Sequence, residues 1–413
     1  MKEKLYDVAI IGAGASGLCT AVSLKMQDRS LSVLLLEQLD RVGKKLITTG
    51  NGRCNITNAN IELDRYHGKN KEFARFALER FDRVYTESFL AELGIVFTFD
   101  NEGRAYPYSL QASSVVDAFR FAADNLGVEI RLQEKVEDIE KTKQGYEIKT
   151  QNGKIGALKV VCATGLYSGG QKIGSNGSVY RILKQKGYKA VAVTPAIVQI
   201  KTENTLTKSL KGIKVNANAT ILSGGKTIRS EFGEVLFCDY GLSGPPILQI
   251  SRCVERTNDK KQIVLDLMPE YTYENVLEML KYRLYALRGR TLEEFFTGML
   301  NKRLGQAIIK LTNKKLSDSV DKLSDGDLKT LTSLIKGLNF EVTGTTGFDN
   351  SQVSAGGLDT CQFDSKTMMS KKDKGLYAIG EILDIDGDCG GFNLQWAWSS
   401  ALCAAESIID DLR

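Results

Sequence analysis

The sequence predicts an α/β fold that opens with a Rossmann-like unit in residues 7–37. An apolar run over residues 8–11 is typical of a buried parallel strand, and it ends in glycines at positions 12, 14 and 17. A second apolar run, over residues 31–36, ends at Glu37, twenty residues after the last of these glycines. A strand, a glycine-rich turn, a helix and an acid at this spacing form a dinucleotide-binding fingerprint.

The glycines and the acid have separate roles in such a fingerprint. Gly12 permits a tight turn from strand to helix, Gly14 lets the backbone approach a pyrophosphate, and Gly17 lets the helix pack close to the sheet. The diphosphate lies on the helix N-terminus, and Glu37 accepts hydrogen bonds from ribose hydroxyls. The alternative is a glycine-rich turn in another kind of α/β protein, but the surrounding strand, helix and acid favour dinucleotide binding.

Composition indicates an ordinary globular protein of two or three domains. The chain has 413 residues, of which 42% are hydrophobic and 25% charged. Its net charge of +5 is spread over 105 charged residues with no long basic block, so we expect neither a nucleic-acid nor a membrane partner. No apolar run approaches the roughly 20 residues of a membrane-spanning helix, and the first strand begins too early for a signal peptide. We therefore expect a cytoplasmic protein.

Cysteine and histidine usage argues against a metal site. The eight cysteines include no C-x-x-C pair, and we expect free thiols in a reducing compartment. The single histidine, His67, stands in a polar stretch and is predicted to lie at the surface. The acids that follow Asp384 do not keep the register of a calcium loop. We predict no bound metal.

Residues 41–58 are too polar and glycine-rich for a helix or a strand, and a loop is expected there. Because this segment follows the second strand, it should hang over the carboxyl ends of the sheet, where ligands of such folds bind. Its backbone N–H groups and cations could wrap a phosphate or a polar ring edge; an exposed surface loop is the alternative. The residues concerned are Gly43, Lys44, Lys45, Gly50, Gly52 and Arg53.

The predicted secondary structure changes in the middle of the chain. Helices are expected in residues 70–93 and in residues 113–126, the latter capped by Ser113 or Ser114. Strands are then expected at 128–132, 136–139, 146–150 and 158–162. Short β runs over residues 190–268 predict an inserted β domain, and residues 272–336 have helical periodicity, with caps such as Asp325 or Asp327.

The last segment returns to the opening pattern. A buried strand over residues 375–379 leads into Gly380 and Glu381, and an alanine-rich helix runs to the C-terminus. The apolar strand over residues 158–162 similarly ends in the small residues Ala163, Thr164 and Gly165. A strand that ends in small residues allows close approach of a ligand.

Four motifs together resemble those of the BaiN/RdsA-type three-domain flavoproteins, which include aminoacetone-oxidase-like enzymes. They are the opening GAGASG with Glu37, the segment 41–58, the segment 342–357 and the segment 375–401. The resemblance covers nearly the whole chain and implies non-covalently bound FAD. It also implies a flavin domain made of both chain ends (1–189 and 346–413), an inserted β-barrel-like domain (190–270 and 337–345) and a small helical domain (271–336).

The resemblance also implies which residues contact FAD. Val136 would lie against adenine, Gly380 and Glu381 beside the ribityl chain or pyrophosphate, and the N–H groups at 391–394 at the pyrimidine edge of the flavin. Departures from the family occur at Leu166, at Gly177-Ser178 and at Cys238-Asp239. The complete expected set is Gly12, Gly14, Ala15, Ser16, Gly17, Glu37, Gln38, Lys44, Lys45, Gly50, Gly52, Arg53, Cys54, Asn55, Val136, Ala163, Thr164, Gly165, Gly380, Glu381, Gly391, Phe392, Asn393 and Leu394.

The reaction is less defined than the cofactor. No second G-x-G-x-x-G follows a strand, so NAD(P)H would dock transiently at the flavin. The main hypothesis is NAD(P)H-dependent reduction of a conjugated C=C in a small molecule such as an enone or dienone, as in a 3-dehydro-bile-acid reductase. The alternatives are a peroxide-producing amine oxidase, an RNA-modifying flavoprotein and a non-catalytic flavin-binding protein. Catalytic residues stay open; the candidate proton donors are Cys54, Tyr106, Tyr108, Asp239 and Tyr240.

Overall fold

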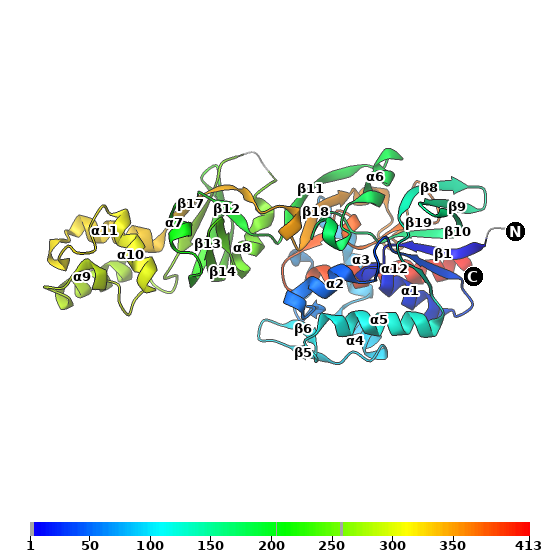
Figure 1. The fold of residues 1–413 in the computed structure, drawn as a ribbon, viewed down its shortest axis with the longest axis horizontal. Helices are drawn as coiled ribbons and strands as arrows, with labels where there is room; N and C mark the ends of the chain where they lie inside the picture. Colours follow the sequence, from blue (N-terminus) through cyan, green and yellow to red (C-terminus); the bar gives the residue numbers. More distant parts are fainter. Residues whose placement is uncertain (1–3, 204, 257–258) are drawn as a thin grey trace. The chain divides into compact units, whose positions relative to one another are not determined.

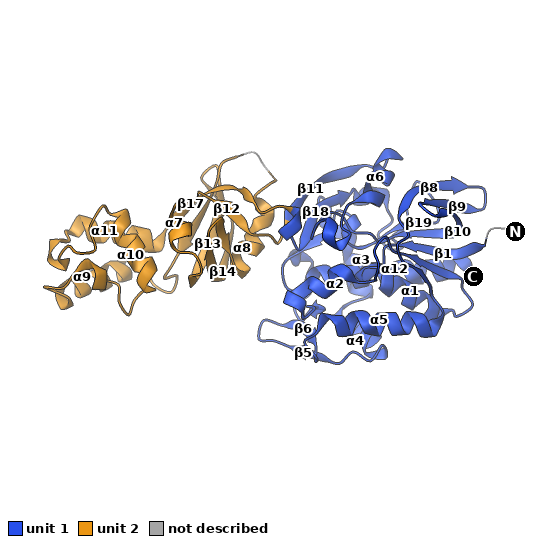
Figure 2. Cartoon of the chain, viewed as in Figure 1, with its two compact units in different colours: residues 1–195, 348–413 blue, residues 196–347 orange. Residues whose placement is uncertain are grey.

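The computed structural model describes residues 4–203, 205–256 and 259–413. They form two compact units (Figure 2): unit 1 contains the residues up to 195 and residues 348–413, and unit 2 contains residues 196–347. Unit 1 is thus built from both ends of the chain. The predicted insertion, residues 190–345, begins earlier than unit 2 because β11 (Ala190–Ala196) pairs with β18 (Val353–Leu358) of unit 1.

A seven-stranded sheet forms the centre of unit 1. Its order is β7-β2-β1-β10-β9-β8, and β19 also pairs with β10. The pairs from β7 to β10 are parallel, as is β10 with β19, whereas β9 runs antiparallel to both β10 and β8. The strands are β1 (Leu5–Ile11), β2 (Val33–Leu36), β7 (Glu129–Arg131), β8 (Val136–Thr142), β9 (Gly145–Thr150), β10 (Gly153–Cys162) and β19 (Leu376–Ala378).

Strand β10 brings the two chain ends together. On one side it pairs along its length with β1. On the other side its first half pairs with β9, and its last three residues pair with β19 near the C-terminus. Residues 160–162, which carry both β1 and β19 as neighbours, are completely buried. The segments that follow β1, β10 and β19 therefore leave the sheet at the same edge.

Helices cover this sheet (Figure 1). Helix α12 (Phe392–Leu412) packs along α1 (Ala15–Gln27), which also contacts α5 (Ala112–Leu126). The remaining helices of unit 1 are α2 (Lys44–Thr48), α3 (Arg75–Arg80), α4 (Arg83–Glu92) and α6 (Ser178–Gln185). Its short strands are β3 (Thr57–Asn58), β4 (Tyr66–His67), β5 (Phe97–Phe99), β6 (Arg104–Pro107) and β20 (Asp386–Gly387).

Unit 2 is a closed six-stranded barrel with a helical insertion. The strand order is β12-β15-β14-β13-β16-β17, and three helices lie in the chain between β16 and β17. The strands are β12 (Ile200–Thr202), β13 (Lys214–Ser223), β14 (Lys226–Cys238), β15 (Gly241–Ser243), β16 (Lys261–Asp266) and β17 (Leu338–Thr345). The helices of unit 2 are α7 (Thr205–Ser209), α8 (Pro245–Ile250), α9 (Tyr273–Ala286), α10 (Lys302–Leu311) and α11 (Asp325–Lys336).

Three local predictions differ from the structure. Residues 41–58 are not all loop, because α2 forms within them. Helix α5 begins at Ala112, with Gln111 and not a serine as its N-cap residue. Helix α11 is capped by Ser324, whose hydroxyl accepts from the Asp327 N–H while the Asp327 carboxylate accepts from the Ser324 N–H. This reciprocal capping box makes Asp327 the third residue of the helix and not its cap.

Helix α12 is buried along most of its length, and its polar side chains hold loops from the first part of the chain. The amide of Gln395, completely buried, donates to Thr86 Oγ1 at 2.8 Å and accepts from Thr57 Oγ1 at 2.6 Å. The indole N–H of Trp398 donates to the Ile56 carbonyl at 3.0 Å. The helices in the described part of the chain include none that is long and apolar enough to cross a membrane.

We predict that Gln395→Leu destabilises the protein by about 1 to 3 kcal/mol, the range for leaving buried polar groups without partners. The groups left without this partner are the hydroxyls of Thr57 and Thr86, whereas the Phe81 carbonyl, to which Gln395 also donates, keeps its bond from the Ser399 hydroxyl. Denaturant unfolding of the apoprotein measures the change. The exposed Gln185 is the matched control, and equal stability of the two leucine variants would contradict the prediction.

Candidate functional site

The first glycine-rich turn leaves β1 and enters α1. A Cβ at Gly12 would lie 2.7 Å from the Ala163 carbonyl oxygen, and one at Gly17 would lie 1.8 Å from the Gly12 carbonyl oxygen. Both positions therefore need glycine for the protein's own packing. A Cβ at Gly14 would have no described atom within 4 Å. Because nothing in the described chain fills the space in front of Gly14, that space is available to a ligand.

The N-terminus of α1 faces this space without a cap. Gly14 is the N-cap residue, no described side chain caps the helix, and the first turn contains no acid. The N–H groups of Ala15, Ser16 and Gly17 thus carry the positive end of the helix dipole, which suits a diphosphate. Gly380, which follows β19, approaches the same turn: a Cβ there would lie 3.0 Å from Ser16 Oγ.

The acid at the end of β2 is largely buried and partly engaged. The Glu37 carboxylate accepts from the backbone N–H groups of Ala13 and Leu39, each at 3.0 Å, and burial raises its pKa. A carboxylate has about four acceptor positions, so capacity is left for ribose hydroxyls. The Glu134 N–H donates to the Glu37 carbonyl at 2.8 Å. This contact brings the buried Val136, two residues further on, toward the same end of β2.

Some of the other residues expected to contact FAD are already bonded within the protein, whereas others border open space. The Gln38 amide is already used, because it donates to the Gly174 carbonyl at 2.6 Å and accepts from Asn176 at 2.9 Å. The Lys44 ammonium lies 3.6 Å from the Asp40 carboxylate. No described atom would lie within 4 Å of a Cβ at Gly165, which follows Ala163 and Thr164 after β10.

A cluster that sequence reasoning missed connects three segments. The ammonium of Lys45 lies 2.5 Å from the Glu381 carboxylate and also bonds to the Ser168 hydroxyl. Ser168, completely buried, donates to the other oxygen of Glu381 at 2.6 Å. Both acid and cation were expected at the cofactor, but Ser168 was not. Its position three residues after Gly165 was the available signal.

A second uncapped helix N-terminus lies at the start of α12. Gly391 is the N-cap residue with φ 100°, no described side chain caps the helix, and its first turn, with Phe392, Asn393 and Leu394, contains no acid. The Asn55 amide joins this turn to the 41–58 segment, since it accepts from the Gly391 N–H at 3.1 Å and donates to the Thr57 carbonyl at 3.0 Å. A Cβ at Gly391 would lie 2.4 Å from that carbonyl oxygen, so glycine is required.

The rest of segment 41–58 varies in exposure. Gly50 packs on the backbone of Asn55, whereas a Cβ at Gly52 would have no described atom within 4 Å. The exposed Arg53 guanidinium lies 4.9 Å from the centre of the Tyr106 ring. Cys54 is completely buried, and burial raises its pKa to about 12. Cys54 is therefore a thiol at neutral pH and not a thiolate nucleophile.

The other candidate proton donors belong to different units. Tyr106 and Tyr108 lie in unit 1, and burial raises the pKa of Tyr106. Asp239 and Tyr240 lie in unit 2. The Lys211 ammonium, 2.6 Å from the Asp239 carboxylate, lowers the pKa of that acid. Asp239 therefore stays ionised near neutral pH and is a poor general acid.

His67 differs from its prediction as a surface residue. Its side chain is 24% exposed, and Nε2 lies 2.7 Å from the carboxylate of Asp388, which is 4% exposed. The pairing of β4 with β20 positions the two residues. Because Asp388 stands three residues before Gly391, the histidine contacts the loop that leads into α12. A contact between residues 321 positions apart has no local signal in the sequence.

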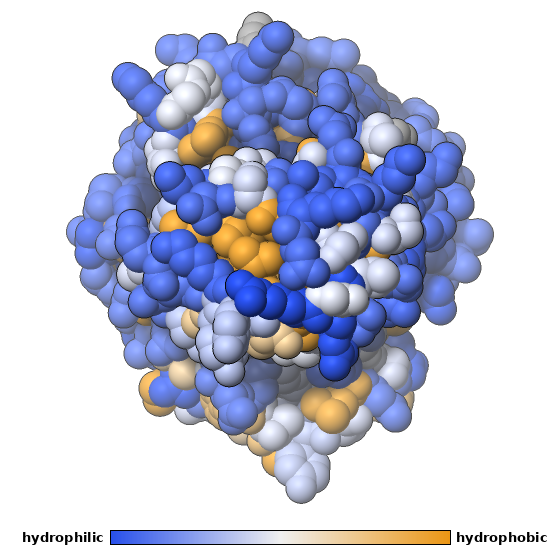
Figure 3. Space-filling view, turned by 90° about the vertical axis from the view of Figure 1, so that its left-hand side faces the viewer, coloured by the Kyte–Doolittle hydropathy of each residue, from blue (hydrophilic) through white to orange (hydrophobic). Residues whose placement is uncertain are grey.

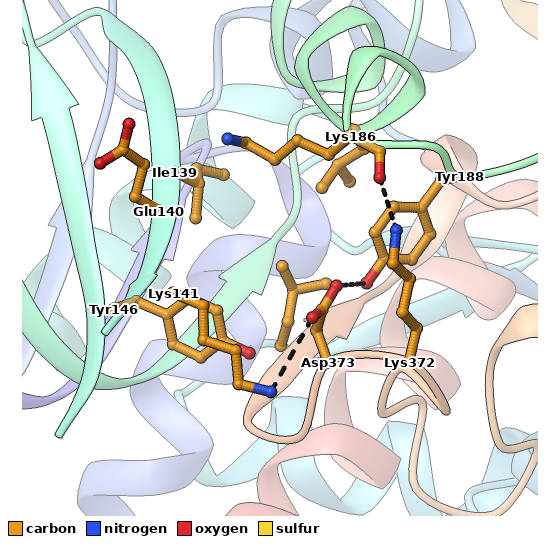
Figure 4. Close-up of a pocket in the computed structure, with 10 residues that line it drawn as sticks. Ile139, Glu140, Lys141, Tyr146, Lys186, Tyr188, Lys372 and Asp373 are labelled. Carbon is orange, nitrogen blue, oxygen red and sulfur yellow. Dashed lines mark hydrogen bonds and ion pairs between the residues drawn. The ribbon is translucent and has the colours of Figure 1, made fainter. Parts of the chain in front are cut away.

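A separate cleft in unit 1 has a volume of about 330 Å³ and is lined by residues of β8, α6 and the segment before β19 (Figure 4). Three lysines line it, but each is engaged. Lys141 lies 3.8 Å from Asp373, Lys186 pairs with Asp138 at 2.7 Å, and Lys372 donates to the Lys186 carbonyl at 2.5 Å. The described residues around this cleft include none of the expected FAD contacts. The cleft is therefore separate from the residues that are expected to contact FAD.

The site fits a flavin adenine dinucleotide. The open space at Gly14, the two uncapped helix N-termini and the spare acceptor capacity of Glu37 match a diphosphate, an anionic ring edge and a ribose. With the similarity of the whole chain to known proteins, these features define an FAD-dependent oxidoreductase. The family model described as HI0933-like protein Rossmann domain matches residues 6–407. The chain therefore belongs to the HI0933-like family.

Similar proteins include two kinds of enzyme. The 3-dehydro-bile acid delta(4,6)-reductase of Clostridium scindens is 33% identical over 97% of this chain and 98% of its own. The ribosomal RNA dihydrouridine synthase of Haemophilus influenzae is 30% identical over 97% of this chain and 97% of its own. That of Escherichia coli is 30% identical over 98% of this chain and 98% of its own. A solved quinol–fumarate reductase with menaquinol shares the fold, with TM-score 0.53 and 14% identity over 99% of this chain and 72% of that chain.

We predict that Gly14→Val folds but does not bind FAD, because its side chain enters the space that the pyrophosphate needs. Flavin fluorescence titration of the apoprotein measures binding, and thermal unfolding of the same sample measures folding. Gly17→Ala is the contrasting variant, since its Cβ would overlap the Gly12 carbonyl and disrupt the fold itself. FAD binding by Gly14→Val with native affinity would place the cofactor elsewhere.

Proposed function

We propose that this protein uses NAD(P)H to reduce a C=C bond conjugated with a carbonyl group, with an enone or dienone as the first substrate class. The observation that carries this proposal is the similarity to a reductase over 97% of the chain. Bound FAD would supply the redox chemistry, taking a hydride from NAD(P)H and passing it to the alkene, whose neighbouring carbon takes a proton.

The residues of this chain would bind and polarise the cofactor. Glu37 and the N–H groups at the start of α1 would hold the adenosine and diphosphate. The start of α12 would face the pyrimidine edge of the flavin, where negative charge develops on reduction, and would stabilise that charge through its dipole. Lys45 and Glu381, which already share Ser168, would lie between these two ends.

The cysteines argue against a disulfide relay. The described structure contains eight free cysteines. Burial raises the pKa of the thiol at Cys54 and of that at Cys389, the two cysteines beside the segments that meet at α12. A protonated, buried thiol is a weak nucleophile and a poor partner for exchange. Direct hydride transfer to a substrate therefore accounts better for the site.

We expect anaerobic mixing with NADH or NADPH to bleach the flavin absorbance, and an enone to restore it. Stopped-flow spectroscopy follows both half-reactions, and mass spectrometry of the product should show two added hydrogens. A saturated ketone of the same skeleton is the control and should leave the flavin reduced. Bleaching by an aminoketone or another primary amine, with peroxide formed in air and no response to NAD(P)H, would instead indicate an amine oxidase.

A second candidate substrate is ribosomal RNA. Uracil also contains a C=C conjugated with a carbonyl, so the same redox chemistry would yield dihydrouridine. Two relatives with that activity in their names are 30% identical along the whole chain. The charge distribution also favours this candidate: residues 271–336 contain twelve lysines and arginines against eight aspartates and glutamates, so they carry +4 of the chain's +5.

Helix α9 displays the side chains that this candidate needs. Tyr282 and Tyr285 are 72% and 69% exposed, and their spacing of three places them on neighbouring parts of one helix face. The Arg288 guanidinium lies 5.2 Å from the centre of the Tyr285 ring. Exposed aromatic rings with arginine beside them can stack on unpaired bases and contact phosphates. In Figure 3, which views the molecule from this side, the surface is mainly hydrophilic around a small apolar patch.

If RNA is the substrate, the double variant Tyr282→Ala, Tyr285→Ala should weaken binding of a ribosomal RNA transcript by about 1 to 3 kcal/mol for each ring that stacks on a base. Filter binding at several salt concentrations measures the affinity. Phe121→Ala is the matched control, because Phe121 is also exposed and lies under an arginine, but in unit 1. Equal binding by wild type and the double variant would exclude α9 as the RNA contact.

A further inference from the structure

Two short segments of opposite charge pair with each other in unit 1. Residues 65–69 read RYHGK and residues 384–388 read DIDGD, so bases and acids occur at every second position. Strands β4 and β20 pair these segments antiparallel, with His67 opposite Asp386. Because side chains alternate along a strand, each set of charges lies on one face of its segment. The register therefore brings the bases of one segment to the acids of the other.

The contacts between the segments are short, and the acids are buried. All three aspartates are at most 4% exposed. His67 Nε2 lies 2.7 Å from Asp388 Oδ1, and the Arg65 guanidinium lies 3.6 Å from Oδ2 of the same acid. The backbone N–H of Lys69 donates to Asp384 Oδ2 at 2.8 Å, whereas its ammonium pairs with Asp359. Of the two side chains at Asp388, His67 is the better shielded from water, with 24% of its side chain exposed against 47% for Arg65.

This pairing continues into the first turn of α12. The Asn393 amide donates to the Asp388 carbonyl at 3.2 Å and to the Gly387 carbonyl at 2.7 Å. The Tyr66 hydroxyl donates to the Phe392 carbonyl at 3.1 Å. A change at Asp388 is therefore transmitted, both through the backbone and through its charge, to the helix end at which we place the pyrimidine edge of the flavin.

We propose that His67 is a positioning residue that offsets the charge of Asp388 beside the N-terminus of α12 and so raises the reduction potential of the bound flavin. This inference rests on the FAD site proposed above. The helix N-terminus favours the negative charge that reduction adds, whereas a nearby buried carboxylate opposes it. The hydrogen bond from His67 draws the carboxylate charge toward the histidine and leaves the helix end positive.

The test is the midpoint potential of the FAD-loaded protein, measured by spectroscopic titration against a redox dye, together with the Kd of FAD in its oxidised and reduced forms. His67→Gln should lower the potential, because reduced FAD should lose about fivefold more affinity than oxidised FAD, the size typical of one charge near a helix end. Asp388→Asn should raise the potential. In that background, His67→Gln should have no further effect.

Lys69→Gln is the matched control, because its ammonium is 67% exposed and pairs with Asp359, outside the loop that leads into α12. It should leave the potential unchanged. A purely structural role for His67 would raise both Kd values equally without moving the potential, and that result would overturn the inference. If His67→Gln fails to fold, an unchanged potential in Asp388→Asn overturns it equally. Wild-type protein that binds no FAD would instead refute the cofactor site itself.

Discussion

The pairing of both chain ends with strand β10 is the constraint on which the candidate site depends. β1 lies on one side of β10 and β19 on the other, so the turns that follow all three strands meet at one edge of the sheet. These turns are in direct contact: Gly12 packs on Ala163, and Gly380 packs on Ser16. The segment near position 380 lies beside the turn at position 12 because β10 pairs with the strands that precede both. The barrel unit is inserted in the chain between these two segments.

Helix α12 places its N-terminus at the candidate site in a fixed position. Buried hydrogen bonds, together with apolar packing, fix the position of this helix along its axis. Gln395 must meet Thr57 and Thr86, and the indole groups of Trp396 and Trp398 must meet the carbonyls of Gly380 and Ile56. Each such group would be left unsatisfied by a shift, and a buried unsatisfied group is costly. The uncapped end of α12 is thereby held against Asn55.

Local patterns predicted the α/β fold and the family, because the glycine turn, the apolar strands and the acid at Glu37 each act within about thirty residues. They also assigned separate roles to Gly12, Gly14 and Gly17, and among these three only Gly14 borders open space in the structure. The contacts of Ser168 and His67 were missed because they join distant parts of the chain. Ser168 bonds to Glu381 and His67 to Asp388, and such partners, 213 and 321 positions apart, leave no periodic signal. The Ser324 cap was misassigned because adjacent acids and serines all favour helix starts.

The comparisons also bear on where substrate choice resides. Relatives named for a bile-acid substrate and for ribosomal RNA resemble this chain almost equally and over its whole length. Both substrates contain a C=C conjugated with a carbonyl, so the redox half of the site has no reason to differ between them. Discrimination must then come from surfaces that meet the remainder of the substrate, which is apolar in one case and polyanionic in the other. In this chain the excess positive charge lies in the helical insertion, where α9 presents Tyr282 and Tyr285, and Arg288 follows two residues after the helix ends. We therefore expect substitutions in α9 to affect RNA as a substrate and not a small molecule, whereas Gly14→Val would remove either activity through loss of the cofactor.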